Sequence, residues 1–300
     1  MTPRHGCPTV TTRMHADELD IDEPLVRRLL AEQFPEWAAL PLRRVEPSGT
    51  DNAIFRLGDE LAVRIPRRDG PTTPGSKELE WLPRLAPIVP VEIPVPVAQG
   101  RPAAGYPWHW EIHTWVDGET VPVEEIDAIQ AAIDLAAIVR ALQQIDPAGA
   151  PPGRGNPLAE RDAEMAGWLA EYDGDPGAAA EWQRGLAAPA WDGPPVWHHG
   201  DLDMRNWLVH DGRITGLIDW GCMGVGDPAC DVMVAWKLHS ADARDAFREA
   251  LPTDDATWER ARGWALSQAI GAVAYYTPEN NPSLYHEGEA WLALLRSERS

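Results

Sequence analysis

The sequence has few cysteines and no long apolar run. Its three cysteines, an odd number in 300 residues, do not suit a disulfide framework, which favours a reducing compartment. No stretch of about 18 apolar residues is present, so we expect no membrane-spanning helix. Residues 1–13 have no apolar centre, so we expect residues 1–14 to be a disordered tail rather than a signal peptide, with Met14 as a possible natural start. These absences predict a cytoplasmic protein without a membrane partner.

Basic residues are also scarce. Lysine and arginine total 26 against 47 aspartates and glutamates, a formal net charge of −21. This balance argues against a nucleic-acid partner, because phosphate neutralisation needs basic side chains. It favours a cationic small molecule, while an acidic surface that simply faces solvent explains the charge equally well.

The phosphate-binding signatures of many nucleotide enzymes are missing. There is no GxxxxGK[ST], which excludes a P-loop, and no GxGxxG. Hydrophobic residues make up 44% of the chain, as in ordinary globular proteins, and the length allows a sizeable core.

Strand patterns dominate before about residue 116 and helix patterns dominate after it. The strand candidates are 42–47, 53–57, 61–65 and 108–116, with helices over 22–34 and 77–85. The later helices are expected at 123–145, 158–171, 177–187, 228–239, 241–250, 255–276 and 283–297. In the first of these, the apolar stripe is Ile126, Ile129, Ile133, Ala137, Val139 and Leu142. The pattern predicts an α+β protein with a small β-rich lobe and a larger helical lobe.

Residues 196–220 hold the densest set of chemically active side chains. Two apolar runs flank the dipeptide Asp211-Gly212, which predicts a hairpin with a two-residue turn. Such a hairpin brings Asp201 and Asn206, before its first strand, close to Asp219 after its second. Two carboxylates and an amide suit an oxygen-ligand Mg²⁺ site.

A metal-hydrolase cluster is the alternative for this stretch. His198, His199, Asp201 and Asp203 would be its ligands. That chemistry recruits further histidines or aspartates from other strand ends, and the remaining histidines show no such pattern.

The ordered set HGDLDMRN, LIDWG and GDPACD resembles the aminoglycoside phosphotransferase superfamily, across about residues 15–300. The resemblance implies a bilobal protein-kinase-like fold, with an N-lobe over 15–113 that binds nucleotide. A C-lobe over 114–300 would carry the catalytic loop and the acceptor-binding helices. It also implies transfer of the γ-phosphoryl of ATP or GTP to a small-molecule hydroxyl, with Mg²⁺. The stretch between Asp219 and Asp231 is eleven residues, too short for a protein kinase's docking loop.

The resemblance also assigns roles in the catalytic loop. Asp201 would take the proton of the acceptor hydroxyl, and Asn206 and Asp219 would hold Mg²⁺. His199 and Asp231 would support the loop structurally.

For the nucleotide, the candidates lie in the first lobe and the linker. Ser48, Gly49 and Thr50 form a turn between two strands that could present N–H groups to phosphates. Arg64 stands where the family usually has lysine, and Glu78 is its expected partner. Thr114 and Val116 would meet the purine through their backbone.

The acceptor is the least determined part of the site. Asp203, Trp220 and Glu279 are possible acceptor contacts, although Asp203 and Glu279 could face solvent and Trp220 could pack beneath the metal site. A small, hydroxylated and cationic acceptor, an aminoglycoside, fits the acidity of the chain. Macrolides, or alcohols such as choline, homoserine and sugars, are alternatives, as is a domain that binds nucleotide without turnover.

Overall fold

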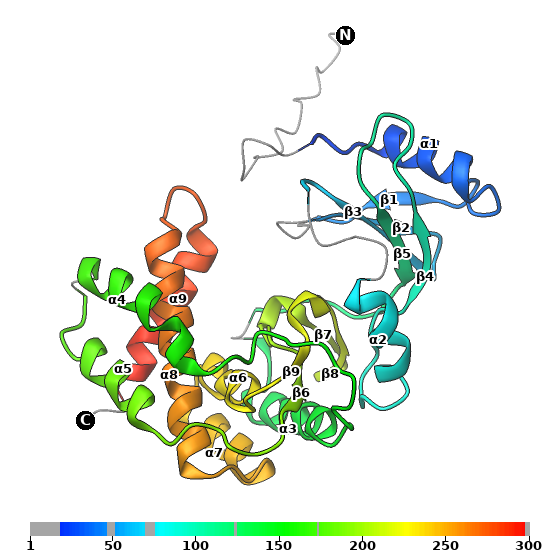
Figure 1. Ribbon diagram of the computed structural model, residues 1–300. Helices are drawn as coiled ribbons and strands as arrows, with labels where there is room; N and C mark the ends of the chain where they lie inside the picture. The colour runs from blue at the N-terminus through cyan, green and yellow to red at the C-terminus, as the bar shows by residue number, and fades with distance from the viewer. Residues whose placement is uncertain (1–18, 47–51, 70–75, 123–124, 173, 298–300) are drawn as a thin grey trace. The chain divides into compact units, whose positions relative to one another are not determined.

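The structure, a computed structural model, describes residues 19–46, 52–69, 76–122, 125–172 and 174–297 (Figure 1). The chain divides into two compact units, Met1–Ser76 with Pro96–Trp115 and Lys77–Val95 with Val116–Ser300. The tail expected over residues 1–14 lies outside the described residues.

The first unit is an antiparallel sheet with one helix against it. Its strand order is β1-β2-β3-β5-β4. The strands are β1 (Leu42–Arg44), β2 (Asn52–Leu57), β3 (Leu61–Pro66), β4 (Pro96–Gly100) and β5 (Trp110–Thr114). Helix α1 (Glu23–Gln33) is capped by Asp22, which accepts a hydrogen bond from the Leu25 N–H, and it buries Val26, Leu29 and Leu30 in the core of this unit.

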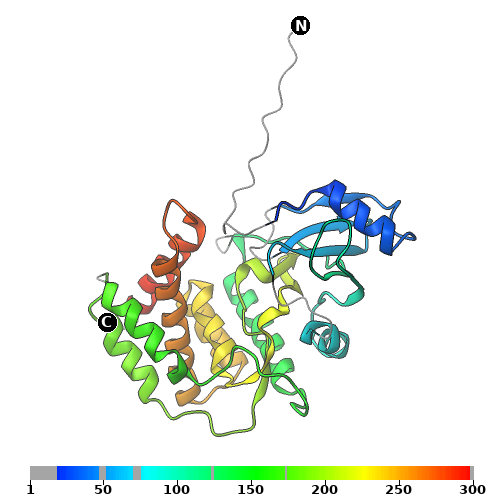
Figure 2. The same ribbon diagram turned by 45° about the horizontal axis from the view of Figure 1, so that its top comes forward.

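The second unit is mainly helical. Its helices are α2 (Lys77–Leu85), α3 (Ala128–Gln143), α4 (Asp162–Glu171), α5 (Ala178–Ala187), α6 (Ala229–Val232), α7 (Ala241–Ala250), α8 (Asp255–Tyr275) and α9 (Pro282–Ser297). Helix α8 packs against α4, α5, α6 and α9, and both views show these helices grouped together (Figures 1 and 2). None of the helices in the described residues combines the length and apolar content needed to cross a membrane.

Two short antiparallel sheets complete the second unit. Strand β6 (Val196–His198) pairs with β9 (Gly224–Gly226), and β7 (Trp207–His210) pairs with β8 (Arg213–Leu217). These strands hold the segments that carry the candidate site. Because the first unit is built on a sheet and the second is mainly helical, the fold class expected from the sequence, α+β with a β-rich and a helical part, is confirmed.

Residues Lys77–Val95 belong to the second unit, which differs from the expected lobe of residues 15–113. Leu82 and Leu85 of α2 are buried in the core of the helical unit, and Trp81 packs on Trp197 with ring centroids 4.8 Å apart. Further along, the Glu92 N–H donates to the Thr215 carbonyl of β8 at 2.8 Å, and the Leu217 N–H donates to the Glu92 carbonyl at 2.9 Å. These contacts join the segment to strands β6 and β8, which follow it by more than a hundred residues.

The buried face of α3 is only partly the predicted one, because Val139 and Leu142 are buried as expected but two isoleucines of the predicted stripe are not. Ile129 and Ile133 are 48% and 44% exposed, whereas Asp134 is 6% exposed. The Asp134 carboxylate accepts hydrogen bonds from the Arg213 guanidinium and from the Ile214 N–H at 3.0 Å. This polar contact with β8 turns the helix so that Ala131, Leu135 and Ile138 are buried as well.

The helix predicted over 228–239 is also shorter than expected. Helix α6 ends at Val232, and a 3-10 helix continues over Met233–Leu238.

Candidate functional site

The β7–β8 hairpin closes through Asp211 and Gly212, whose φ angles of 49° and 74° are both positive. Positive φ at both central residues defines the type I′ turn, which matches the twist of paired strands. At the open end of the hairpin, the Ile218 N–H donates to the Asn206 carbonyl at 2.9 Å. The predicted hairpin is confirmed, and it brings Asn206 next to the residue that precedes Asp219.

Asn206 also reaches the catalytic loop. Its Nδ2 donates to the Asp201 carbonyl at 2.9 Å and lies 3.3 Å from the Asp201 Oδ2. Since both bonds use the amide nitrogen, the Oδ1 oxygen of Asn206 is the atom that can bind a cation. Asp219 adds a carboxylate on a left-handed backbone, with φ +61° and ψ +70°. Amide and carboxylate oxygens are the donors Mg²⁺ takes, so these two residues fit that ion.

His199 connects Asp201 to the Asp219 segment. The Asp201 N–H donates to the His199 Nδ1 at 3.2 Å, so the proton must sit on Nε2, which donates to the Ile218 carbonyl at 3.1 Å. Complete burial lowers the pKa of His199 to about 4, so the ring is neutral at pH 7. Its edge-to-face contact with Trp220, 4.6 Å between centroids, fixes the ring plane.

Asp231 supports the same loop from α6. Its two carboxylate oxygens accept the His199 N–H at 2.7 Å and the Gly200 N–H at 2.8 Å. Burial raises the pKa of Asp231 to about 6, although both backbone hydrogen bonds act to lower it. The conformation of residues 199–200 is thus tied to one fully buried side chain.

Gly200 has a conformation that requires glycine. Its φ is +81°, and a Cβ there would lie 2.5 Å from the Cys222 carbonyl oxygen. The segment that follows Asp219 therefore presses directly against the catalytic loop.

Two of the residues considered for the acceptor are buried instead. Asp203 is 3% exposed and forms ion pairs with Lys237 at 3.1 Å and with Arg205 at 2.8 Å. It neither faces solvent nor offers an unpaired charge to a ligand. Trp220 is fully buried and donates its ring N–H to the Leu217 carbonyl, so it is a packing residue. Glu279 is exposed near the end of α8, and its predicted contact with the acceptor remains a prediction.

The nucleotide candidates are divided between the units. Ser48, Gly49 and Thr50 lie outside the described residues. Arg64 lies on β3 of the first unit, and the expected pairing with Glu78 of α2 stays a prediction. Thr114 ends β5, and Val116 is a buried residue of the second unit.

Glu111, which the sequence did not single out, lies directly opposite Arg64 on β5. Burial would raise the pKa of Glu111, but the hydrogen bond and charge of His113 and the charge of Arg64 bring it below its usual range. Arg64 therefore has a carboxylate neighbour within its own sheet.

Glu78 lies beside the Asp219 segment. A Cβ at Gly221 would lie 3.9 Å from the Glu78 Oε1 and 3.6 Å from the Asp219 Oδ1. The start of α2 and the candidate metal-binding segment are therefore close neighbours within the second unit.

Arg154 is the main site residue that sequence reasoning missed. Its Nη1 donates to the Asp201 Oδ1 at 2.6 Å and to the Gly200 carbonyl at 3.1 Å. Burial would lower the pKa of Arg154, but the facing Asp201 carboxylate raises it above its ordinary value. The signal available was an arginine between two glycines, in the stretch that separates the predicted helices 123–145 and 158–171.

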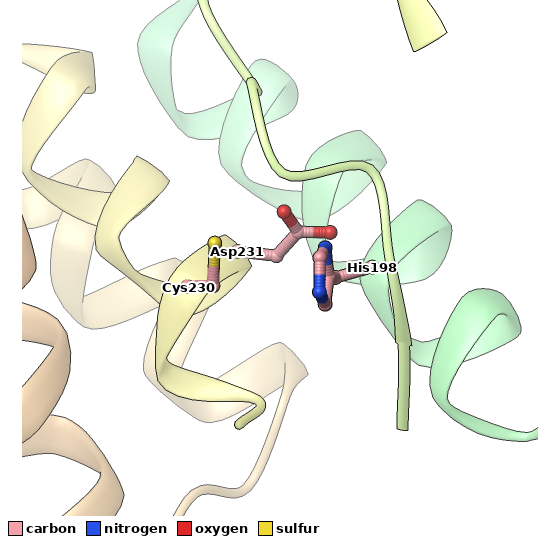
Figure 3. A group of neighbouring side chains, drawn as sticks. All are labelled: His198, Cys230 and Asp231. Carbon is pink, nitrogen blue, oxygen red and sulfur yellow. The ribbon is translucent and has the colours of Figure 1, made fainter. Parts of the chain in front are cut away.

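His198, Cys230 and Asp231 form a buried group whose possible ligand atoms all lie within 4.8 Å of one another (Figure 3). The chemistry does not suit a metal. The Gly155 N–H donates to the His198 Nε2 at 3.0 Å, so Nδ1 carries the proton and has no lone pair to offer. Burial also raises the pKa of the Cys230 thiol well above its usual value. We interpret the group as structural.

Comparison with known proteins identifies the class. The family model described as "Phosphotransferase enzyme family" matches residues 16–264. The chain therefore belongs to this family, and the resemblance seen in the sequence is confirmed. The protein is an enzyme, a small-molecule O-phosphotransferase with a kinase-like fold. No curated protein matches the chain.

Solved structures share the fold at low identity. The GDP complex of aminoglycoside 2′-phosphotransferase-IIIa is 17% identical with a TM-score of 0.71, covering 93% of this chain and 100% of that one. The macrolide 2′-phosphotransferase of Brachybacterium faecium is 22% identical with a TM-score of 0.62, covering 90% and 97%. A streptomycin–ATP complex of aminoglycoside phosphotransferase (2″)-IIa is 18% identical with a TM-score of 0.60, covering 90% and 95%.

Proposed function

We propose that the protein transfers the γ-phosphoryl of ATP or GTP to a hydroxyl of a small molecule, with an aminoglycoside-type acceptor as the first candidate. The observation that carries the proposal is the contact of Asn206 with both sides of the site. Its side chain bonds to Asp201, and its backbone bonds to Ile218, next to Asp219. A base and two cation ligands thus share one end of a hairpin.

The proposed reaction needs one proton acceptor. The acceptor oxygen forms a bond to the γ-phosphorus while the bond from that phosphorus to the β–γ bridging oxygen breaks. The hydroxyl proton passes to the Asp201 carboxylate, which is 30% exposed and therefore reachable. The nucleoside diphosphate leaves, and Asp201 then releases its proton to water.

Asn206 and Asp219 would hold Mg²⁺ in this scheme. The ion supplies charge neutralisation on the nucleotide phosphates when it is bound. The contribution of the chain is a fixed pair of oxygen donors, with Asp219 in a strained left-handed conformation that the flanking segments maintain. Ser48, Gly49, Thr50, Arg64, Glu78, Thr114 and Val116 remain predictions for nucleotide binding, and cytoplasmic location and a possible role in antibiotic resistance also remain predictions.

An aminoglycoside acceptor is supported by charge and by the neighbours. The net charge of −21 attracts polycations. Structural neighbours include complexes with kanamycin, gentamicin and streptomycin.

A macrolide is the second candidate, and the pairing of Asp203 favours it. Lys237 and Arg205 already neutralise that carboxylate, and Arg205 also pairs with Glu287 at 3.1 Å. Two carboxylates near the catalytic loop are thus unavailable to ligand amines, which suits a less charged acceptor. A macrolide 2′-phosphotransferase is also among the neighbours.

The test is a coupled assay of ADP or GDP release with ATP and GTP against aminoglycosides, macrolides and simple amino alcohols. We expect acceptor-dependent release with one acceptor class, and phosphorylated product by mass spectrometry. Nucleotide binding with no release above background for any acceptor would favour a binding domain without turnover and contradict the proposal.

A further inference from the structure

The base proposed above is held by a residue from a distant part of the chain. Arg154 lies in the connection between α3 and α4, and its Nη1 is 2.6 Å from the Asp201 Oδ1. The same nitrogen donates to the Gly200 carbonyl. One guanidinium therefore contacts both the carboxylate and the backbone of the catalytic loop.

The backbone that carries Arg154 is fixed. We call residues 151–156 the strap. The Arg154 N–H donates to the Cys222 carbonyl at 3.1 Å, and the Gly155 N–H donates to the His198 ring. The Asp227 N–H donates back to the Gly155 carbonyl at 2.8 Å. The strap is thus bonded to the strand before the catalytic loop and to the segment after Asp219.

Close packing of glycines leaves the strap little freedom. A Cβ on Gly153 would lie 2.8 Å from the backbone of Gly224, and one on Gly226 would lie 2.1 Å from the Gly155 oxygen. Backbones can approach this closely only where both lack side chains. The position of the Arg154 backbone, from which its side chain extends, is therefore closely restricted.

We propose that Arg154 is a positioning residue for phosphoryl transfer, holding the Asp201 carboxylate in the orientation that accepts the proton of the acceptor. The inference rests on the proposed function of Asp201. Arg154 holds Oδ1, and the Asn206 Nδ2 lies 3.3 Å from Oδ2. Both oxygens are thereby restrained, and Oδ2, with the longer contact, is the one that receives the proton.

The position favours arginine. The rigid planar guanidinium holds Nη1 at a fixed place between the carboxylate and the carbonyl, whereas a lysine ammonium is a point charge on a flexible stem. Arg154→Lys should therefore restore only part of the activity that Arg154→Ala loses. A role in packing alone would rank the two variants in the same order, because lysine keeps most of the aliphatic stem, so chemical rescue rather than this ranking distinguishes the two roles.

The experiment is chemical rescue of Arg154→Ala with guanidinium, at concentrations well below those that unfold the protein. We expect kcat to fall by about 10- to 100-fold, the range for a misplaced catalytic group, while KM for nucleotide changes little. Added guanidinium should raise kcat of this variant by occupying the vacated position. Thermal unfolding and circular dichroism check that Arg154→Ala and Arg154→Lys are folded.

Arg161 offers the matched control. It is a partly exposed arginine in the following helical turn, and its partners are Ser267 and Glu164 rather than Asp201. Arg161→Ala should keep most of its kcat and gain nothing from guanidinium. Near-wild-type kcat in Arg154→Ala would overturn the inference, and so would a loss of kcat that guanidinium does not restore. In either case an inactive Asp201→Asn would still support the proposed function. Wild-type activity in Asp201→Asn would instead overturn both.

Discussion

Lys237 and Asp203 form an ion pair of 3.1 Å in which both side chains are only 4% exposed. Burial would raise the pKa of Asp203, but Lys237 and Arg205 bring it below its usual value. The pair joins the catalytic loop to the 3-10 helix after α6, so it belongs to the support of the loop. The contribution of this ion pair to the stability of the fold can be measured separately from any role of Asp203 in acceptor binding.

Asp203→Asn should destabilise the protein by about 3–5 kcal/mol, because it leaves the Lys237 ammonium buried without its counter-charge. Asp203→Asn with Lys237→Met should lose less than the two single changes added together, which urea unfolding measures. The ranking of acceptors by kcat/KM should be the same in the variant. A selective fall of kcat/KM for amine-bearing acceptors would show instead that Asp203 contributes to acceptor binding.

Gly200→Ala should cost about 2–4 kcal/mol, combining left-handed strain with overlap onto the Cys222 carbonyl. Gly212 is the matched control, because its φ of +74° is similar and nothing lies within 4 Å of a Cβ there. Gly212→Ala should cost only about 1 kcal/mol, the strain alone. Equal losses in the two variants by urea unfolding would show that the close contact at Gly200 is unimportant.

His198 should make the protein acid-sensitive. Burial first, and then nearby positive charges, lower the pKa of His198 to about 3, against about 6.5 when unfolded. Its neutral form is favoured by folding, so the stability it contributes is present above pH 6.5 and is lost as pH falls toward 3. Between pH 6.5 and 5 the loss is about 2 kcal/mol.

His198→Gln keeps an acceptor for the Gly155 N–H and removes the titration. Its unfolding free energy, measured in urea at pH 7.5, 6 and 5, should fall less steeply with acid than that of the wild type. Parallel slopes for the two proteins would contradict the assignment.

Asp219→Asn tests the proposed metal ligand. Asparagine tolerates the left-handed backbone of this position, so the change removes charge without adding strain. The gain in nucleotide affinity on adding Mg²⁺ should shrink by about tenfold or more, because affinity follows the charge of the ligands. Calorimetry with and without Mg²⁺ measures it, and an unchanged metal dependence would exclude Asp219 as a ligand.

The sequence predicted what local patterns determine. Asp211-Gly212 between two apolar runs specified the hairpin, and the hairpin brings Asn206 beside the segment of Asp219. Contacts between distant segments were not predictable in this way. The burial of Asp203 depends on Lys237, and the orientation of α3 depends on Arg213 meeting Asp134. Arg154 gave no periodic signal, because its place beside Asp201 comes from the packing of glycines across the strap.

The central claim is that Asp201 is the base of a phosphotransferase, and single-turnover transfer of radiolabelled γ-phosphoryl to the acceptor tests it most directly. Asp201→Asn should bind nucleotide as the wild type does and transfer at least about 100-fold more slowly, the usual contribution of a general base. Asp211→Asn, in the exposed turn of the same hairpin, should transfer at the wild-type rate. Transfer by Asp201→Asn at a rate close to that of the wild type would contradict the account.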